Sequence, residues 1–120
     1  MANTIQVSKG LSVPYCFTTE ALENFCVDTD TALTDIYVPL TAKKGQFDAV
    51  NSLLFHIVAA GYEDLNETMP YTKEDVKGWL KGKNGVLNYP LFTGVVMIAA
   101  KVLFDNNEDE VEESEAVEKN

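Results

Sequence analysis

Apolar and polar residues alternate along the N-terminal part of the chain. The alternation forms two runs on either side of Ser8-Lys9-Gly10: Ile5 and Val7, then Leu11, Val13, Tyr15 and Phe17. A period of two is typical of strands, and a glycine between two such runs can take the positive φ that a tight turn requires. The pattern therefore predicts a β-hairpin over residues 4–17. Because an isolated hairpin is only marginally stable, its apolar face must pack against helices.

The period changes to three and four after residue 17, which indicates helices. Thr18 or Thr19 can cap a first short helix, with Glu20 favourably placed in its first turn. Its apolar stripe consists of Leu22, Phe25 and Cys26. A second stripe follows an Asp30 or Thr31 cap: Leu33, Ile36, Tyr37 and Leu40. Pro39 lies inside it, so we expect that helix to end near Val38 or to kink there.

The clearest helical pattern covers residues 46–60 and precedes Gly61, which is a typical residue just beyond a helix C-terminus. Its stripe contains Phe47, Val50, Leu53, Leu54, Ile57 and Val58. Further on, the segment Thr72-Lys73-Glu74-Asp75 resembles a capping box. It predicts a short helix with Val76, Trp79 and Leu80, ended by Gly82 and Gly85.

The most apolar run is Leu91 to Phe104, which we expect to be the last helix. It has fourteen residues and includes Lys101, whereas a membrane span needs about 20 residues. We therefore expect no membrane association. The run is apolar around most of its circumference, and a small domain has difficulty burying every side of one helix. Either the other helices wrap it, or part of it is a docking surface.

These patterns predict one α+β domain that is mainly α-helical. The expected order is an N-terminal β-hairpin followed by four to five short helices, in a single globular domain over residues 1–104 with the helical cluster at 18–104. Residues 105–120 hold eight acidic residues and a single Lys, without a large apolar residue. Such a block of like charge predicts a disordered acidic tail.

The charge of the 120-residue chain argues against nucleic acid as a partner. The formal net charge is -10, from 19 acidic and 9 basic residues, and all the basic residues are Lys. Phosphate recognition needs a basic surface and relies heavily on Arg. Lys77, Lys81 and Lys83 do surround Trp79, but a solvated helix face explains that cluster better than nucleotide stacking.

The chain offers few residues for catalysis, and we expect no enzyme, cofactor or metal site. His56 is the single His and lies four residues after Ser52, so the two would share a helix face. A Ser–His pair competes there with a surface or partly buried helix His, which is the commoner case. Cys16 and Cys26 form no CxxC motif and lie near apolar stripes. Because the N-terminus lacks a signal-like sequence, we expect free thiols and a cytoplasmic protein.

The order of segments resembles the tail assembly chaperones of long-tailed bacteriophages. The resemblance rests on TIQVSKGLSVPYCFTTEALENFC, TALTDIYVPLTA, FDAVNSLLFHIVAAGY and TKEDVKGWL, followed by an apolar helix and an acidic end. It implies a non-enzymatic role in viral assembly. Members of that family bind the long, apolar, helical tape-measure protein, keep it soluble and help to recruit tail-tube subunits.

Candidate partner-binding residues lie on the last helix and on the Trp79 helix, where an apolar groove could accept an amphipathic helix. They are Trp79, Leu91, Phe92, Val95 and Met97. We expect a charge at Phe92 or Val95 to abolish partner solubilisation, unless these residues belong to the core. An edge strand of the hairpin could also pair between subunits of a homo-oligomer.

Two other functions remain open on the sequence alone. The chain could be a small acidic phage-encoded inhibitor or adaptor that binds a basic host protein, in which case binding should fall steeply with salt. It could also be a structural component retained in a virion or another assembly. Binding of an apolar client, by contrast, should survive high salt.

Overall fold

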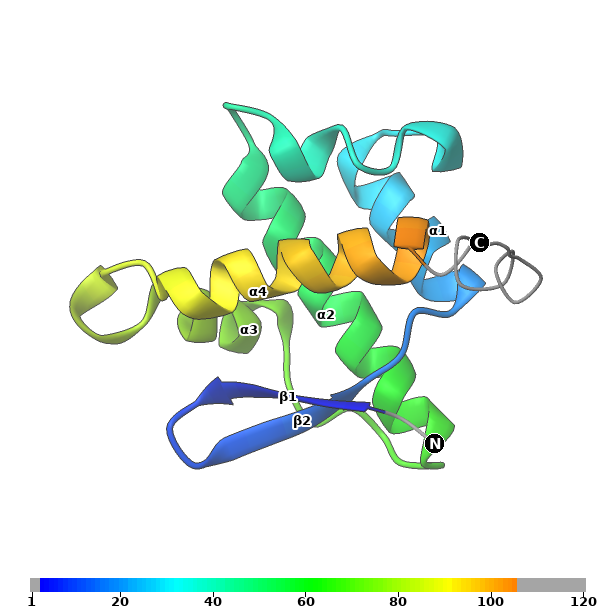
Figure 1. Cartoon of the computed structure of the whole chain (residues 1–120). Coiled ribbons are helices and arrows are strands. Elements are labelled where there is room, and N and C mark those ends of the chain that lie inside the picture. Colours follow the sequence, from blue (N-terminus) through cyan, green and yellow to red (C-terminus); the bar gives the residue numbers. More distant parts are fainter. Residues whose placement is uncertain (1–2, 106–120) are drawn as a thin grey trace, which may run out of the picture.

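The computed structural model describes residues 3–105 and shows a two-stranded antiparallel hairpin followed by helices (Figure 1). This confirms the predicted α+β, mainly α-helical class with an N-terminal hairpin. The elements are β1 (Asn3–Ser8), β2 (Leu11–Tyr15), α1 (Thr19–Thr29), α2 (Gln46–Asp64), α3 (Lys73–Lys81) and α4 (Tyr89–Ala100), with 3₁₀ turns η1 (Leu33–Asp35), η2 (Pro39–Thr41) and η3 (Lys83–Gly85) and a π-helical turn η4 (Lys101–Asp105).

The hairpin has the predicted turn. Gly10 takes a φ of 78°, and β1 pairs with β2 in a register that places Ile5 opposite Val13. A bulge between Gln6 and Ser8 interrupts the ladder beside the turn. Val7 and Val13 are buried in the core, so the alternating pattern correctly identifies the inner face of the hairpin.

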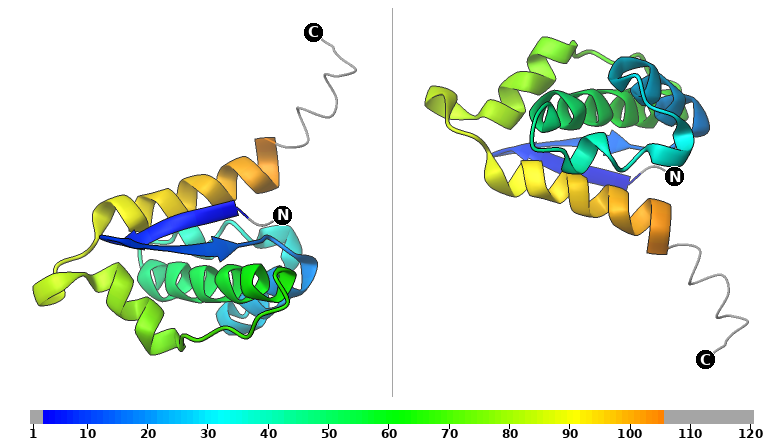
Figure 2. Two further views of the ribbon diagram at one scale, coloured as in Figure 1. Left: turned by 90° about the horizontal axis from the view of Figure 1, so that it is seen from below. Right: turned by 90° about the horizontal axis from the view of Figure 1, so that it is seen from above.

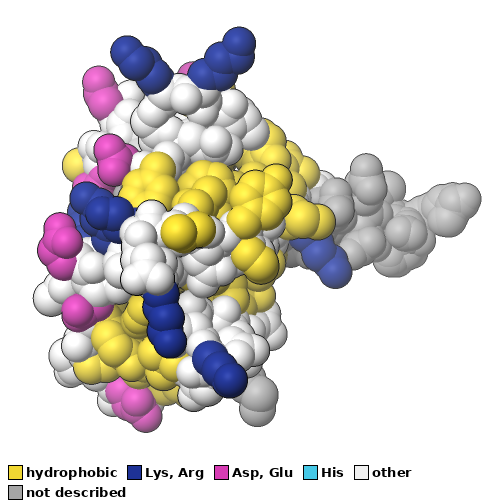
Figure 3. Space-filling model, turned by 90° about the vertical axis from the view of Figure 1, so that its left-hand side faces the viewer, with side chains coloured by type: hydrophobic (Ala, Val, Ile, Leu, Met, Phe, Trp, Pro, Cys, Tyr) yellow, Lys and Arg dark blue, Asp and Glu magenta, His cyan; other side chains and the backbone are white. Residues whose placement is uncertain are grey.

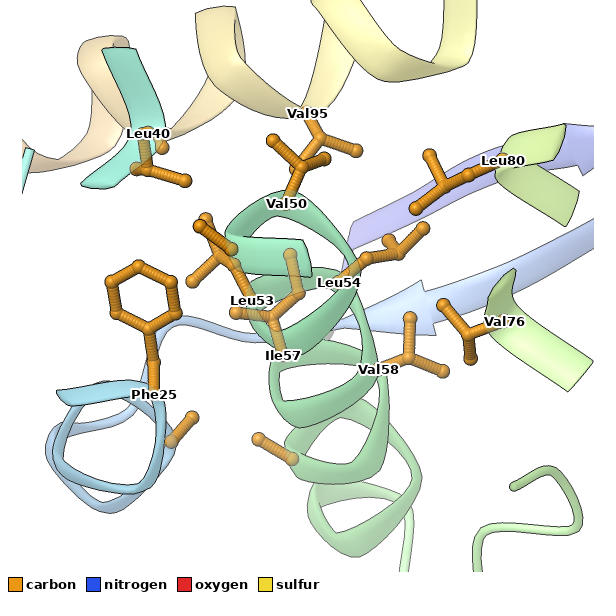
Figure 4. Close-up of a cluster of buried hydrophobic side chains, with 14 of the residues drawn as sticks. Phe25, Leu40, Val50, Leu53, Leu54, Ile57, Val58, Val76, Leu80 and Val95 are labelled. Carbon is orange, nitrogen blue, oxygen red and sulfur yellow. The ribbon is translucent and has the colours of Figure 1, made fainter. Parts of the chain in front are cut away.

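Helix α2 is the centre of the domain. α1, β2, α3, η2 and α4 all contact it, and Figures 1 and 4 show these elements arranged around it. Its predicted apolar stripe is buried except for Phe47, which is half-buried. The largest fully buried side chains from the whole fold meet there: Phe25, Leu40, Leu53, Leu54, Ile57, Leu80, Val7, Val13, Val50, Val58, Val76 and Val95.

The predicted stop of this helix at Gly61 is wrong, because α2 continues through Gly61 to Asp64. The glycine serves a packing role instead. A Cβ atom built at Gly61 would lie 2.5 Å from the backbone carbon of Pro14 and 2.5 Å from the nitrogen of Tyr15. The absence of a side chain lets strand β2 approach the helix backbone directly. Cys16 N–H then donates to the carbonyl of Ile57 over 2.9 Å.

The segment after α1 forms two 3₁₀ turns rather than the expected helix. Pro39 occupies the first turn of η2, where its missing N–H costs no hydrogen bond. An α-helix through this position would bring its ring against the carbonyl of Asp35. Ile36 and Leu40 are nevertheless buried, so half of the predicted stripe packs in the core although the helix is not formed, while Leu33 is 48% exposed.

The predicted caps of α1 and α3 are confirmed. Thr18 caps α1 by accepting the N–H of Ala21 at 3.1 Å. At α3, the Thr72 hydroxyl accepts the N–H of Asp75 at 3.2 Å, and the Asp75 carboxylate accepts the N–H of Thr72 at 2.9 Å. These reciprocal bonds form a capping box with Asp in the third position.

The last helix begins earlier than expected, at Tyr89, with Asn88 as its cap and Pro90 in its first turn. It runs into η4, which ends at Asp105. The predicted disordered tail falls outside the described residues beyond that point. Within residues 3–105, no helix combines the length and apolar character that crossing a membrane requires.

We predict that Gly61→Ala destabilises the fold by about 3 kcal/mol, because the new methyl group collides with the backbone of β2 rather than with a movable side chain. Gly78→Ala is the matched control: it lies in helix α3, and a Cβ there meets nothing within 4 Å. That change should stabilise the fold by roughly 0.5–1 kcal/mol. Urea unfolding followed by circular dichroism measures both. Equal effects of the two substitutions would contradict the close approach.

Candidate binding surface

A cluster around Asp28 joins three helices. Asp28 lies near the end of α1, and a single oxygen of its carboxylate, Oδ2, is contacted from two other helices. Ser52 Oγ of α2 donates to it at 2.8 Å, His56 Nε2 of α2 lies 2.9 Å away, and Lys73 Nζ of α3 donates at 2.6 Å. Lys73 also lies 5.8 Å from the centre of the Phe55 ring.

The cluster favours an ionised Asp28. Partial burial acts to raise the pKa of this carboxyl, but hydrogen bonds from Lys73, Ser52 and His56, together with the positive charge of Lys73, outweigh it. The result is a pKa lowered from 3.8 to about 2. Asp28 is therefore an anion throughout the physiological range and holds α1, α2 and α3 together.

The same geometry decides between the two interpretations of Ser52 and His56. The two side chains do share a face of α2, as their spacing predicts. However, Ser52 donates its proton to Asp28 and not to His56, and only 6% of its surface is exposed. A nucleophilic serine needs a base within hydrogen-bonding reach of its own hydroxyl. The cluster therefore has the arrangement of an interhelical clamp and not of a Ser–His pair.

An open hollow of about 660 Å³ lies beside this clamp. Its lining mixes both charges: Asp28, Asp48, Lys44 and Lys73. Asn51 also lines it, and its side-chain oxygen is buried without a hydrogen-bond partner. Among the residues that the structure describes, no three His, Cys, Asp or Glu side chains gather as a metal site would require.

The two cysteines are free thiols in separate places. Cys26 is buried on α1, and burial, aided by the nearby charge of Glu23, raises the pKa of its thiol. Cys16 is half-buried just after β2. A raised pKa keeps Cys26 in the unreactive thiol form, so it acts as a small apolar core residue.

The five predicted partner-binding residues divide into core and surface. Leu91 and Val95 belong to the core, with 5% and 1% of their surface exposed. They therefore present nothing to a partner, and a charge at Val95 would disrupt the core itself. Phe92 is half-buried and stacks on Phe47, with ring centres 6.2 Å apart.

Trp79 and Met97 differ in how much they offer to a partner. Trp79 is half-buried against Tyr71, with ring centres 4.8 Å apart. Met97 is 68% exposed and lies on the outer face of α4. The helix is thus used in both of the ways that its sequence allows. One face, with Leu91, Val95 and Ala99, is core, and the opposite face is open.

Besides Met97, sequence reasoning missed several exposed apolar residues at the start of α4 and in the segments that flank it. We call the set the α4 surface, and it consists of Val86, Leu87, Tyr89, Met97 and Phe104. Val86 and Tyr89 are 68% and 65% exposed. Figure 3 shows apolar side chains gathered in a band across the face of the molecule that includes the η3–α4 connection. The signal in the sequence was weak, because three of these residues flank the Asn88 cap, outside any periodic run.

Comparisons with known proteins add no relative: no protein-family model, curated protein or solved structure matches this chain. The assignment of a function therefore rests on the sequence pattern and on the geometry described above.

We predict that Asp28→Asn lowers the free energy of unfolding by about 1 kcal/mol at pH 7, because hydrogen bonds to a charged acceptor are replaced by weaker ones. The folded-state pKa is lowered, so the stabilising effect of the charge is complete above pH 3.8. It is lost as the pH falls toward about 2. The stability difference between the parent and the variant should therefore shrink over that interval.

Chemical unfolding at several pH values measures this difference. Asp64→Asn is the control, since it also removes one carboxylate charge, but at the end of α2 and away from the clamp. A difference for Asp28→Asn that stays constant down to pH 2 would contradict the proposed ionised clamp.

Proposed function

We propose that this chain is a non-enzymatic tail assembly chaperone of a long-tailed phage. In this role it binds an apolar helical segment of the tape-measure protein, keeps that protein soluble and helps to recruit tail-tube subunits. The observation that carries the proposal is the α4 surface, a set of exposed apolar side chains beside a core that is already filled by other residues.

The α4 surface contributes little to the stability of the domain. The opposite face of α4 already supplies Leu91, Val95 and Ala99 to the core, so Met97 and Tyr89 are not needed for packing. Burial of a large apolar side chain stabilises by roughly 1.5–3 kcal/mol. Exposed residues of this kind along α4 and its flanks can therefore provide much of the free energy for binding another apolar surface.

The spacing of these residues fits a helical partner. Tyr89 and Met97 are eight residues apart on α4 and so lie on one side of the helix, about 12 Å apart along its axis. That distance matches two turns of an amphipathic helix lying alongside. The flexible thioether of Met97 can adapt to different side chains, which suits a client with many similar apolar stripes.

The net charge of -10 supports the same role. A chaperone that covers apolar stripes on a long client must keep the complex from associating further. A strong negative charge does this by mutual repulsion between complexes. The absence of Arg likewise favours a protein client over nucleic acid.

The proposal predicts that Val86→Glu and Met97→Glu reduce the soluble yield of a co-expressed client at least fivefold while the domain stays folded. Both residues are exposed, so the charge disturbs the binding surface and not the core. Val27→Glu is the matched control, because Val27 is 78% exposed but lies on α1. The client would be the largest apolar-helical or coiled-coil protein encoded nearby, tested by co-purification at low and high salt.

Rescue that persists at high salt, and that is lost with the two α4-surface variants alone, would support the proposal. Equal loss with Val27→Glu would contradict it. Capture of a basic host protein that disappears at high salt would instead support the inhibitor alternative.

A further inference from the structure

Strand β1 has an edge whose backbone groups are unpaired. The register places Thr4 opposite Pro14 and Gln6 opposite Ser12. Because proline has no N–H, Thr4 and Pro14 form a non-hydrogen-bonded pair of the antiparallel ladder. Hydrogen-bonded and non-hydrogen-bonded pairs alternate, so Gln6 and Ser12 form another non-hydrogen-bonded pair. The N–H and C=O groups of Thr4 and Gln6 therefore point away from β2.

Two observations agree with this orientation. Cys16, two residues beyond Pro14, donates its N–H to Ile57 on α2 and not toward β1. In the described part of the chain, no backbone bond to Thr4 or Gln6 is found from outside the strands. The outer edge of β1 thus offers donors and acceptors that only another extended chain could satisfy in order.

A groove follows this edge. Figure 2 shows β1 running beside α4, and between them lies a hollow of about 490 Å³. From β1 it is lined by Ile5, Gln6 and Val7, and from α4 by Pro90, Leu91, Gly94 and Ile98. Pro90, Gly94 and Ile98 follow one another at intervals of four residues, so they form a single stripe along α4. Gly94 has no side chain, and a Cβ there would meet nothing within 4 Å.

The groove continues past the hairpin turn. A second hollow of about 530 Å³ shares Ser8, Lys9 and Asn88 with the first one. It extends to Trp79 and Lys83. The two hollows together form a trough. It is apolar beside Gly94, and its far end has Lys9, Lys83 and the ring of Trp79.

We propose that this trough binds an extended segment of another protein, which adds as a strand to the free edge of β1. The backbone of the segment bonds to Thr4 and Gln6. Its alternate apolar side chains pack beside Gly94 and Ile98, and a carboxylate at one end meets Lys9 and Lys83. The trough shares Val86 with the α4 surface at its far end, but its part beside Gly94 is lined by other residues of α4 than Tyr89 and Met97. The proposal does not depend on the proposed function.

The unpaired backbone groups of the β1 edge favour one strand over a helix or a second copy of this chain. A helix satisfies its own backbone groups and would leave those of β1 unpaired. A second copy would bring its own β2 and α4 to a groove that α4 already lines, whereas a single strand brings no further element. A single extended chain needs only the width of one strand, about 4.8 Å from β1.

The test is selection of ligands from a displayed library of random ten-residue peptides on the full-length protein. We expect selected peptides to share apolar residues at alternate positions and an Asp or Glu near one end. Hydrogen exchange on the complex should show new protection of the Thr4 and Gln6 amides. Fluorescence anisotropy then measures the affinity of the best peptide for each variant.

Gln6→Pro should lower the affinity for that peptide at least about tenfold, because the substitution removes an outward N–H and places a proline ring at the edge of β1. Ser12→Pro is the control, because Ser12 lies opposite Gln6 in the same non-hydrogen-bonded pair, but on β2. It should leave the affinity within about twofold, since it does not touch the groove. Gly94→Leu, which leaves β1 unchanged and fills the groove, should weaken binding to a similar extent as Gln6→Pro.

Several results would overturn the proposal. They are a selection that yields no binder, binders that are equally affected by Gln6→Pro and Ser12→Pro, and binders that Met97→Glu displaces while Gly94→Leu does not. A dimer of the free protein that dissociates in Gln6→Pro would also overturn it, because a second copy would then occupy the edge.

Discussion

The fold depends on helix α2 being approached from several sides at once, and most tightly by strand β2. At Gly61 the strand backbone comes so close that any side chain would collide with it. This contact places the hairpin beside the helix. The Asp28 clamp performs a similar task on another side, where it ties α1 and α3 to Ser52 and His56 of α2. Together these contacts leave α4 to cover the remaining side of the core.

The position of α4 explains the surface chemistry of the domain. One face of the helix completes the core with Leu91 and Val95, so its other faces are exposed to solvent. The side next to β1 forms a groove with an unpaired strand edge, and the outer side presents Met97 and Tyr89. Exposed apolar residues that gather in one patch often mark an interaction surface. Both features are what the proposed binding of another protein requires, whereas the Asp28 cluster has the arrangement of a structural clamp.

The sequence predicted the elements well and their limits less well. Alternation and capping residues identified the hairpin, the Thr18 cap and the Thr72 capping box, because these depend on local geometry. Gly61 was misinterpreted because its role depends on a strand far away in the sequence. The Asp28 clamp was invisible for the same reason, since the partners of Asp28 come from two other helices. On α4, composition alone could not distinguish buried Val95 from exposed Met97, because that depends on how the helix is rotated against α2.

The most direct test of the account is site-specific photo-cross-linking in cells that co-express the apolar helical client. A photoreactive amino acid would replace Met97 in one variant and Val27 in another, both of which are exposed positions on helices. The account predicts a cross-link to the client from position 97 and none from position 27. Cross-links of equal strength from both positions, or none from position 97 while the client remains soluble, would contradict binding through the α4 surface.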